Sequence, residues 1–211
     1  MRGAQMDGPG TITWEAFVAY AEELVRLSDE ISDHWRFSGD KGSAGQAYLE
    51  RRVKTYIPSD CLIDRDKEQE EDEWNKSLET CTDPYEMSSA NERPLIIEHH
   101  VLWSMSYSVP VLYFNGWCAD SPGINAVSVE AAQRLTSGDK LAHSELSQAI
   151  HPILGRPFLH LHPCGSRELL QMASRSANKL VSWLSAVGPA ALGLKLPPDY
   201  FKLTMREADE S

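Results

Sequence analysis

The stretch RPLIIEHHVLWSMSYSVPVLYFNGWC, residues 93–118, decides the fold class because it is the most strand-like part of the sequence. It is rich in aliphatic, β-branched and aromatic residues, which favour strands. It divides into two runs, 95–107 and 109–117, that meet near Pro110. Proline has no amide hydrogen to donate within a sheet, so Pro110 belongs at a turn or at the start of a strand. The pattern predicts two consecutive antiparallel strands.

The segments before this stretch predict a helix followed by further strands. From Thr13 to about Trp35 apolar residues recur at steps of three and four, and Thr13 is suited to cap the start of a helix. Residues 47–57 alternate between apolar and charged side chains, which indicates a half-exposed strand. A shorter strand is expected at 61–63.

The segments after it predict mainly helices. Short helices are expected over about 127–135 and 144–150. A long apolar stripe then predicts one helix from Ser166 to Val187, ended by Gly188-Pro189. The order of helix, β-meander of three or four strands, loop and helices predicts an α+β domain of two layers.

Length and charge define the expected domain organisation. The chain has 211 residues and a net charge of −11, and we expect a flexible tail at 1–10, a single domain at 11–200 and a C-terminal tail at 201–211. Residues 64–92 hold eleven acidic and three basic residues, a net charge of −8. This segment is predicted to be a disordered insertion, either a solvated loop or a contact for a basic partner. The acidic balance argues against nucleic-acid binding.

The cellular compartment is predicted from the N-terminal sequence and from the spacing of the cysteines. The start MRGAQMDGPG lacks the apolar region of a secretory signal, and no stretch approaches the ~20 apolar residues of a membrane span. The four cysteines are widely spaced and form no C-x-x-C pair. Reduced thiols in a cytoplasmic protein are therefore expected, and a monomer is the default expectation.

Cys164 is the residue on which the functional prediction depends, within RPFLHLHPCGSRELL, residues 156–170. Pro163 and Gly165 disfavour regular structure and place the thiol on a turn. The helix predicted to follow would direct its positive end toward the sulfur and lower the pKa of the thiol. These conditions favour a nucleophile, with His162 as a neighbouring polar group.

Three alternatives for Cys164 remain at this stage. Free cysteines are often buried and inert. A metal site would use Cys164 with His160 and His162, and with a fourth ligand from His99, His100 or His151, but H-x-H-x-C has no strong precedent as a ligand spacing. A Cys-His hydrolase is less favoured because no histidine follows Cys164. We expect no metal and no cofactor.

Three blocks of the sequence, 98–117, 151–164 and 182–197, resemble the autophagy-related protein ten family of ubiquitin-conjugating-like enzymes. The resemblance implies a variant ubiquitin-conjugating-enzyme fold with an N-terminal helix, an antiparallel β-meander and C-terminal helices on one face. Ordinary ubiquitin-conjugating enzymes carry an asparagine after a His-Pro pair, well upstream of their cysteine. Here Cys164 itself follows His-Pro, so that asparagine is missing.

The resemblance also implies a reaction. Cys164 would accept the ubiquitin-like autophagy protein twelve as a thioester from its activating enzyme. It would then transfer this protein to a lysine of autophagy protein five, in support of autophagosome formation. Tyr107 and His162 are the expected accessory residues, and strand edges at 48–57 and 109–117 are expected docking surfaces. The alternative function is a non-catalytic ubiquitin-conjugating-like binding module.

Overall fold

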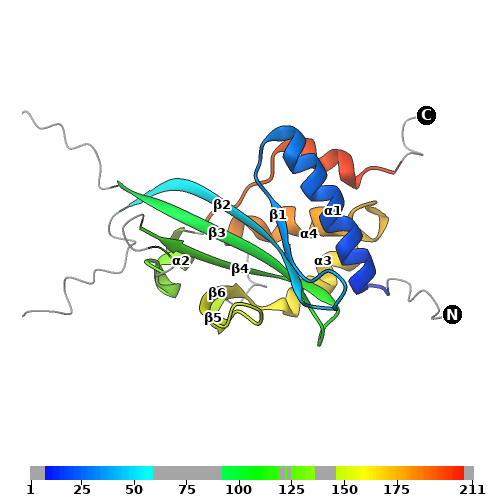
Figure 1. The fold of residues 1–211 in the computed structure, drawn as a ribbon, viewed down its shortest axis with the longest axis horizontal. Helices are drawn as coiled ribbons and strands as arrows, with labels where there is room; N and C mark the ends of the chain where they lie inside the picture. Colours follow the sequence, from blue (N-terminus) through cyan, green and yellow to red (C-terminus); the bar gives the residue numbers. More distant parts are fainter. Residues whose placement is uncertain (1–7, 59–91, 119–121, 123–124, 136–145, 207–211) are drawn as a thin grey trace, which may run out of the picture.

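The computed structural model describes residues 8–58, 92–118, 122, 125–135 and 146–206. Within them the α+β architecture is confirmed: an N-terminal helix, an antiparallel sheet and C-terminal helices (Figure 1). The sheet has six strands in the order β1-β2-β3-β4-β6-β5. Their bounds are Arg36–Gly39 (β1), Ala47–Pro58 (β2), Glu92–Ser104 (β3), Val109–Trp117 (β4), Leu146–Ile150 (β5) and Pro157–Leu161 (β6).

The predicted acidic insertion lies outside the described residues, except for Glu92 at the start of β3. The strand expected at 61–63 lies outside them too. The division into one domain and two tails therefore stays a prediction. One 3-10 helix, Pro198–Thr204, runs across the boundary expected at residue 200. Its Tyr200 is buried, and the hydroxyl donates to Asp33 Oδ2 at 2.9 Å.

The quoted stretch forms the β3–β4 hairpin, with Ser104 paired to Val109 across the turn. Pro110 is the second residue of β4, so the prediction of a strand start at this proline is confirmed. β3 ends at Ser104 rather than at Tyr107 as predicted. The backbone of Ser108 has a positive φ of 53°, and its N–H donates to Ser104 O at 2.8 Å. This tight turn removes Tyr107 from the sheet.

Helix α1 covers Trp14–Ile31 and begins as predicted. The N–H of Ala16 donates to Thr13 Oγ1 at 3.1 Å, which caps the first turn. The predicted end at Trp35 is wrong. The helix ends at Ser32, which adopts a left-handed φ of 58°, and the N–H of Trp35 bonds to the hydroxyl of Ser28. The buried Trp35 leads into β1, a strand that sequence reasoning missed.

The prediction of a helix at 144–150 is wrong, because Leu146–Ile150 is strand β5. Leu146 and Ile150 are four residues apart, a spacing that also suits a helix face. These residues form a strand because they pair antiparallel with β6, with Leu146 opposite Leu161 and Ile150 opposite Pro157. The short helix expected at 127–135 is confirmed as α2, Val129–Leu135.

The single helix predicted over 166–187 is also wrong. The structure has α3 (Ser166–Met172), a 3-10 turn (Ala173–Arg175) and α4 (Lys179–Val187). Asn178 causes the break, because its Oδ1 accepts from the N–H of Val181 and its amide donates to Tyr20 O at 3.1 Å. The buried asparagine thus caps α4 and ties it to α1.

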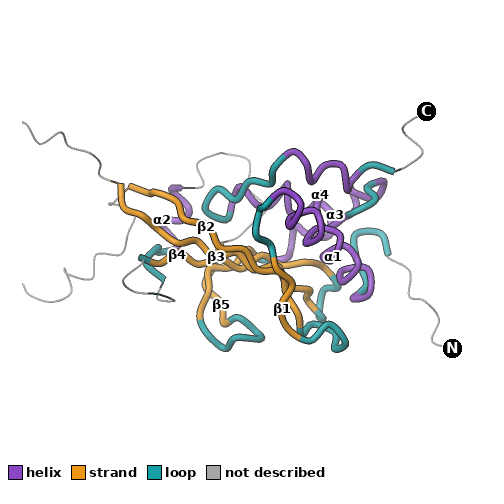
Figure 2. The backbone as a smooth tube through the Cα atoms, turned by 45° about the horizontal axis from the view of Figure 1, so that its top comes forward, coloured by secondary structure: helices purple, strands orange, loops and turns teal. Residues whose placement is uncertain are grey.

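The core lies between one face of the sheet and helices α1, α3 and α4, which Figures 1 and 2 show on the same side. It is built from buried side chains of both layers: Phe17, Leu24, Leu49, Val101, Leu112, Leu180, Trp183 and Leu184. Docking at 48–57 and 109–117 stays a prediction, because β1 pairs with β2 only at residues 47–50 and β6 pairs with β4 only at Tyr113 and Phe114. β2 lies between β1 and β3, β4 lies between β3 and β6, and the edge strands are β1 and β5. In the described residues, no helix is long and apolar enough to cross a membrane.

Candidate active site

Cys164 lies in the 3-10 turn Pro163–Gly165 that joins β6 to α3, and its side chain is exposed. His162 precedes the turn in an extended conformation, and its Nδ1 accepts from the N–H of Cys164 at 3.2 Å. Proline at the first position of the turn has a fixed φ that suits this geometry. The sequence expectation of an exposed thiol on a turn before a helix is therefore met.

The turn is fixed to the sheet and to α4 through Ser166. Its hydroxyl is buried, donates to Pro110 O at 3.3 Å and accepts from Trp183 Nε1 at 3.0 Å. Because buried hydroxyls are costly to leave unpaired, these two bonds specify the position of the first residue of α3. The thiol thus lies on an exposed turn, and Ser166, the residue directly after this turn, is held in place by two hydrogen bonds.

Residues 10–12 connect the Cys164 turn to the β3–β4 turn. Gly10 is buried with a φ of +77°, and a Cβ at this position would lie 2.6 Å from both the carbonyl oxygen and Cγ of Arg167. Ile12 donates its N–H to Ser108 O at 3.0 Å and accepts from Trp103 Nε1 at 2.9 Å. A short N-terminal segment is therefore bonded to the β3–β4 turn at Ser108 and lies against Arg167 in the first turn of α3.

The expected site residues come together. The ring centroids of Tyr107 and His162 are 6.4 Å apart, with the rings inclined at 68°. Tyr107 as a whole residue is 50% exposed. His162 contacts Tyr107 through its ring and Cys164 through its Nδ1. The structure thus places all three predicted residues around one surface point.

A groove of about 350 Å³ opens beside this point. The two residues that precede Cys164, His162 and Pro163, form part of its wall. Most of the remaining lining is apolar or aromatic and comes from β3, β4 and the turn between them: Leu102, Trp103, Met105, Tyr107, Val111 and Tyr113. Sequence reasoning missed the groove, because its lining comes from segments far apart in the chain.

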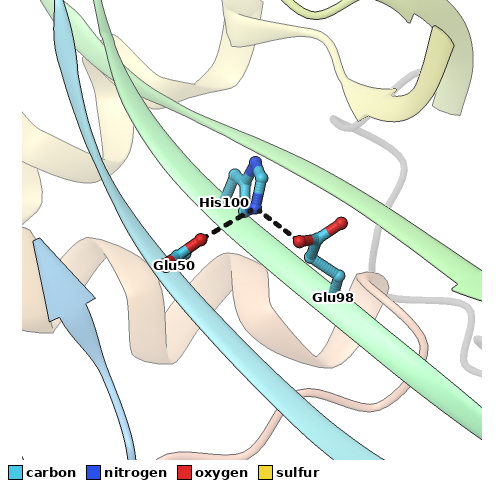
Figure 3. A group of neighbouring side chains, drawn as sticks. All are labelled: Glu50, Glu98 and His100. Atoms are coloured by element: carbon cyan, nitrogen blue, oxygen red, sulfur yellow. Dashed lines mark ion pairs between the residues drawn. The ribbon is translucent and has the colours of Figure 1, made fainter. Parts of the chain in front are cut away.

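A buried polar cluster lies on the face of the sheet opposite the helices. Figure 3 shows Glu50 of β2 beside Glu98 and His100 of β3. Glu98 Oε1 is 3.2 Å from His100 Nε2, and its carboxylate pairs with Arg52 at 2.7 Å and Arg156 at 3.0 Å. Burial alone would raise the pKa of Glu98, but His100 and Arg52 beside it lower that pKa to about 2. The buried carboxylate is therefore charged and balanced by two guanidinium groups.

The cluster continues to His151. His151 Nε2 is 3.0 Å from His100 Nδ1, while His151 Nδ1 accepts from the N–H groups of Ile153 and Leu154. Burial lowers the pKa of His151 to about 3, so the ring is neutral at physiological pH. Its hydrogen then resides on Nε2 and points to His100. These histidines hold the turn at 151–155 over the sheet and do not reach the thiol.

The alternative of a metal held by Cys164 is not supported by the described residues. β6 ends at Leu161 and His162 is still extended, but the turn that starts at Pro163 removes Cys164 from the alternation needed for His160, His162 and Cys164 to face one way. His99 faces the helices, with Nε2 2.8 Å from Ala191 O. The described residues that approach ligand spacing are Glu50, Glu98 and His100, and there Glu98 is already paired with arginine.

Residues 16–197 match the family model described as autophagocytosis associated protein, active-site domain. The human ubiquitin-like-conjugating enzyme ATG10 is 31% identical over 92% of this chain and 94% of its own length. The Arabidopsis thaliana protein of the same name is 27% identical over 71% of the chain and 76% of its own length. The Dictyostelium discoideum protein is 33% identical over 51% of the chain and 55% of its own length.

The family match covers most of the chain that the structure describes. The match spans α1 from its third residue, the sheet, the turn that bears the cysteine and α4. The chain belongs to the ATG10 family, the ubiquitin-like-protein conjugating transferases of autophagy.

Proposed function

We propose that Cys164 is the thioester-forming residue of this enzyme. It accepts the ubiquitin-like autophagy protein twelve from the activating enzyme and passes it to a lysine of autophagy protein five, in the cytoplasm. The observation that supports this is the exposed thiol on a turn held by Ser166, beside a groove that lies open at the same turn. Among the described residues, the other cysteine, Cys118, is half-buried beyond the end of β4.

The two steps have balanced chemistry. In the first, the Cys164 sulfur attacks the thioester carbonyl, the new C–S bond forms, and the thiol of the activating enzyme leaves with the proton. In the second, a lysine amine attacks the same carbonyl, the C–S bond breaks, and an amide forms while Cys164 regains its hydrogen. Both steps pass through an oxyanion, which hydrogen-bond donors stabilise.

Tyr107 and His162 are proposed as accessory groups in these steps. The Tyr107 hydroxyl is the donor that we nominate for the oxyanion, since no asparagine occupies the place it has in ordinary ubiquitin-conjugating enzymes. His162 shapes the turn through the bond from the Cys164 N–H to its Nδ1. It is proposed to hold the thiol rather than to act as a base.

A charging assay tests the proposal. The protein is mixed with ATP, the activating enzyme and the ubiquitin-like protein, and is then separated with and without a thiol reductant. Wild-type protein should give an adduct that the reductant removes. Cys164→Ala should abolish it, and Cys164→Ser should give an adduct that resists the reductant.

The matched control is Cys118→Ala, which removes the second described thiol and should charge as the wild type does. If wild-type protein forms no adduct, the chain is a binding module and the proposal fails. An adduct on Cys164→Ala would also contradict it, because another residue would then carry the thioester.

A further inference from the structure

The groove beside Cys164 is lined mainly by apolar and aromatic side chains, and this lining indicates what the groove binds. We propose that it binds the last residues of the ubiquitin-like protein's C-terminal tail, and that it selects a large apolar side chain at one of the three positions before the terminal glycine. This rests on the proposed function, because it supposes that the terminal carbonyl is attached to Cys164. It goes further by assigning the residues that recognise the tail.

Continuity with the thiol is the first argument. In the thioester the terminal carbonyl carbon is bonded to the sulfur, so the tail must leave the enzyme from that point. An extended chain advances about 3.3–3.6 Å per residue. Because His162 and Pro163 form part of the groove wall and directly precede Cys164, the first tail residues reach the groove.

The lining provides the second argument. Leu102 and Val111 are paired across β3 and β4 and are buried, and Met105 lies in the turn at one end of the groove. Among the described residues that line the groove, none is Asp, Glu, Lys or Arg. A lysine or arginine of the tail would lose hydration there without gaining a carboxylate partner. An aliphatic or aromatic side chain would gain from burial.

The volume is the third argument. A groove of about 350 Å³ falls at the lower end of the ~300–1,000 Å³ typical of binding sites. It therefore fits a few residues of a tail and not a folded domain. The globular part of the donor protein would remain outside, and the groove would contribute to recognition of its last residues alone.

The test introduces a negative charge into the groove lining at Met105 and, as a control, the same charge outside the groove at Met172. Met105 is 66% exposed in the groove lining, and Met172 is 82% exposed on α3, so both accept glutamate without loss of packing. Transfer is measured in a single turnover from activating enzyme already loaded with the ubiquitin-like protein. We expect Met105→Glu to lower the second-order rate constant for charging at least tenfold, mainly by raising the concentration of enzyme needed for the half-maximal rate, and Met172→Glu to stay within twofold of wild type.

A charge swap sharpens the experiment. Donor variants carry arginine at each of the three positions before the terminal glycine in turn. Arginine at one of them should slow charging of the wild-type enzyme, and Met105→Glu should recover at least part of that loss. The alkylation rate of Cys164 by iodoacetamide, measured in all three enzymes, confirms that the thiol and its turn are intact.

The outcomes separate the two proposals. If wild-type enzyme charges and Met105→Glu charges equally well, the groove does not bind the tail and this inference is overturned while the proposed function stands. Equal losses in Met105→Glu and Met172→Glu would overturn it too, since the effect would then not belong to the groove. If wild-type enzyme is not charged at all, the proposed function itself fails.

Discussion

At the scale of single residues, the hydrogen bonding of His162 determines which of its ring nitrogens can serve the reaction. Nδ1 accepts the N–H of Cys164, so in the neutral ring the hydrogen is on Nε2. The ring is thereby oriented as a donor at Nε2. It could accept a proton at Nδ1 only by giving up the bond that shapes the turn. This favours a positioning role over a role as general base.

Tyr107 offers a sharper residue-scale prediction. Tyr107→Phe keeps the ring beside His162 but removes the hydroxyl proposed to stabilise the oxyanion. We expect discharge of the thioester to the acceptor lysine to slow by about ten- to a hundredfold, below the ~10²–10³ reported for buried donors because Tyr107 is half-exposed. Single-turnover discharge of pre-charged enzyme measures this.

The control for Tyr107 is Tyr56→Phe, which removes the hydroxyl of a tyrosine of β2 that is 60% exposed and lies outside the groove lining. It should discharge at the wild-type rate. If Tyr107→Phe does the same, the tyrosine only packs on the turn and the oxyanion is stabilised by another group.

At the scale of elements, the separation of α3 from α4 depends on Asn178. Its side chain caps α4 at Val181 and donates to Tyr20 O and to Glu23 Oε2 of α1. Asn178→Ala loses the cap and both hydrogen bonds that the amide donates to α1. We expect the free energy of unfolding to fall by about 2–3 kcal/mol, measured by urea denaturation.

Asn178→Ser provides the matched comparison, because serine can cap the helix but cannot reach α1 with an amide. Its loss of stability should be smaller than that of the alanine variant by roughly 1 kcal/mol, the usual worth of a cap. Equal losses in the two variants would show that the cap contributes nothing to α4. The inter-helix bonds alone would then account for the effect.

At the scale of the whole molecule, buried neutral histidines make stability depend on pH. Burial lowers the pKa of His99 and His160 to about 4 and that of His151 to about 3, from an ordinary value of 6.5. The unfolded chain binds protons on these groups below about pH 6.5 and the folded chain does not. Stability is therefore fully present above pH 6.5 and is lost as the pH falls toward 4 and 3.

We expect the free energy of unfolding to fall by up to about 1.4 kcal/mol per pH unit for each of these histidines between pH 6 and 5. Urea denaturation across this range measures the slope. His151→Gln should remove one histidine's share of it, whereas His34→Gln, at an exposed position, should leave it unchanged. Identical slopes for wild type and His151→Gln would contradict a neutral His151.

Glu98 makes the stability of the fold depend on pH in a second range, which extends to lower pH. Because its pKa is lowered from 4.5 to about 2, its ion pairs stabilise the fold above about pH 4.5. That contribution is lost as the pH falls from 4.5 toward 2, a window that overlaps the lower end of the histidine window and extends below it. The cluster of Figure 3 is thus consistent with a structural role, holding the 151–155 turn and the β5–β6 hairpin against the sheet.

The sequence by itself determined the features that depend on neighbouring residues. The cap at Thr13 and the start of α1, the strand start near Pro110, and the exposed thiol between Pro163 and Gly165 all follow from local backbone preferences. The α+β class follows from the order of these elements. The resemblance to the family rested on three sequence blocks, and the comparisons confirm it.

Only the tertiary structure decided what depends on partners far along the chain. Residues 146–150 are a strand because β6 pairs with them, and the helix predicted over 166–187 breaks because Asn178 bonds to α1. Which strands lie at the edges, and the groove between β3, β4 and the Cys164 turn, likewise depend on long-range contacts. Hydrogen bonds and packing between distant segments outweigh local preferences of a few tenths of a kcal/mol per residue, and a local pattern does not contain them.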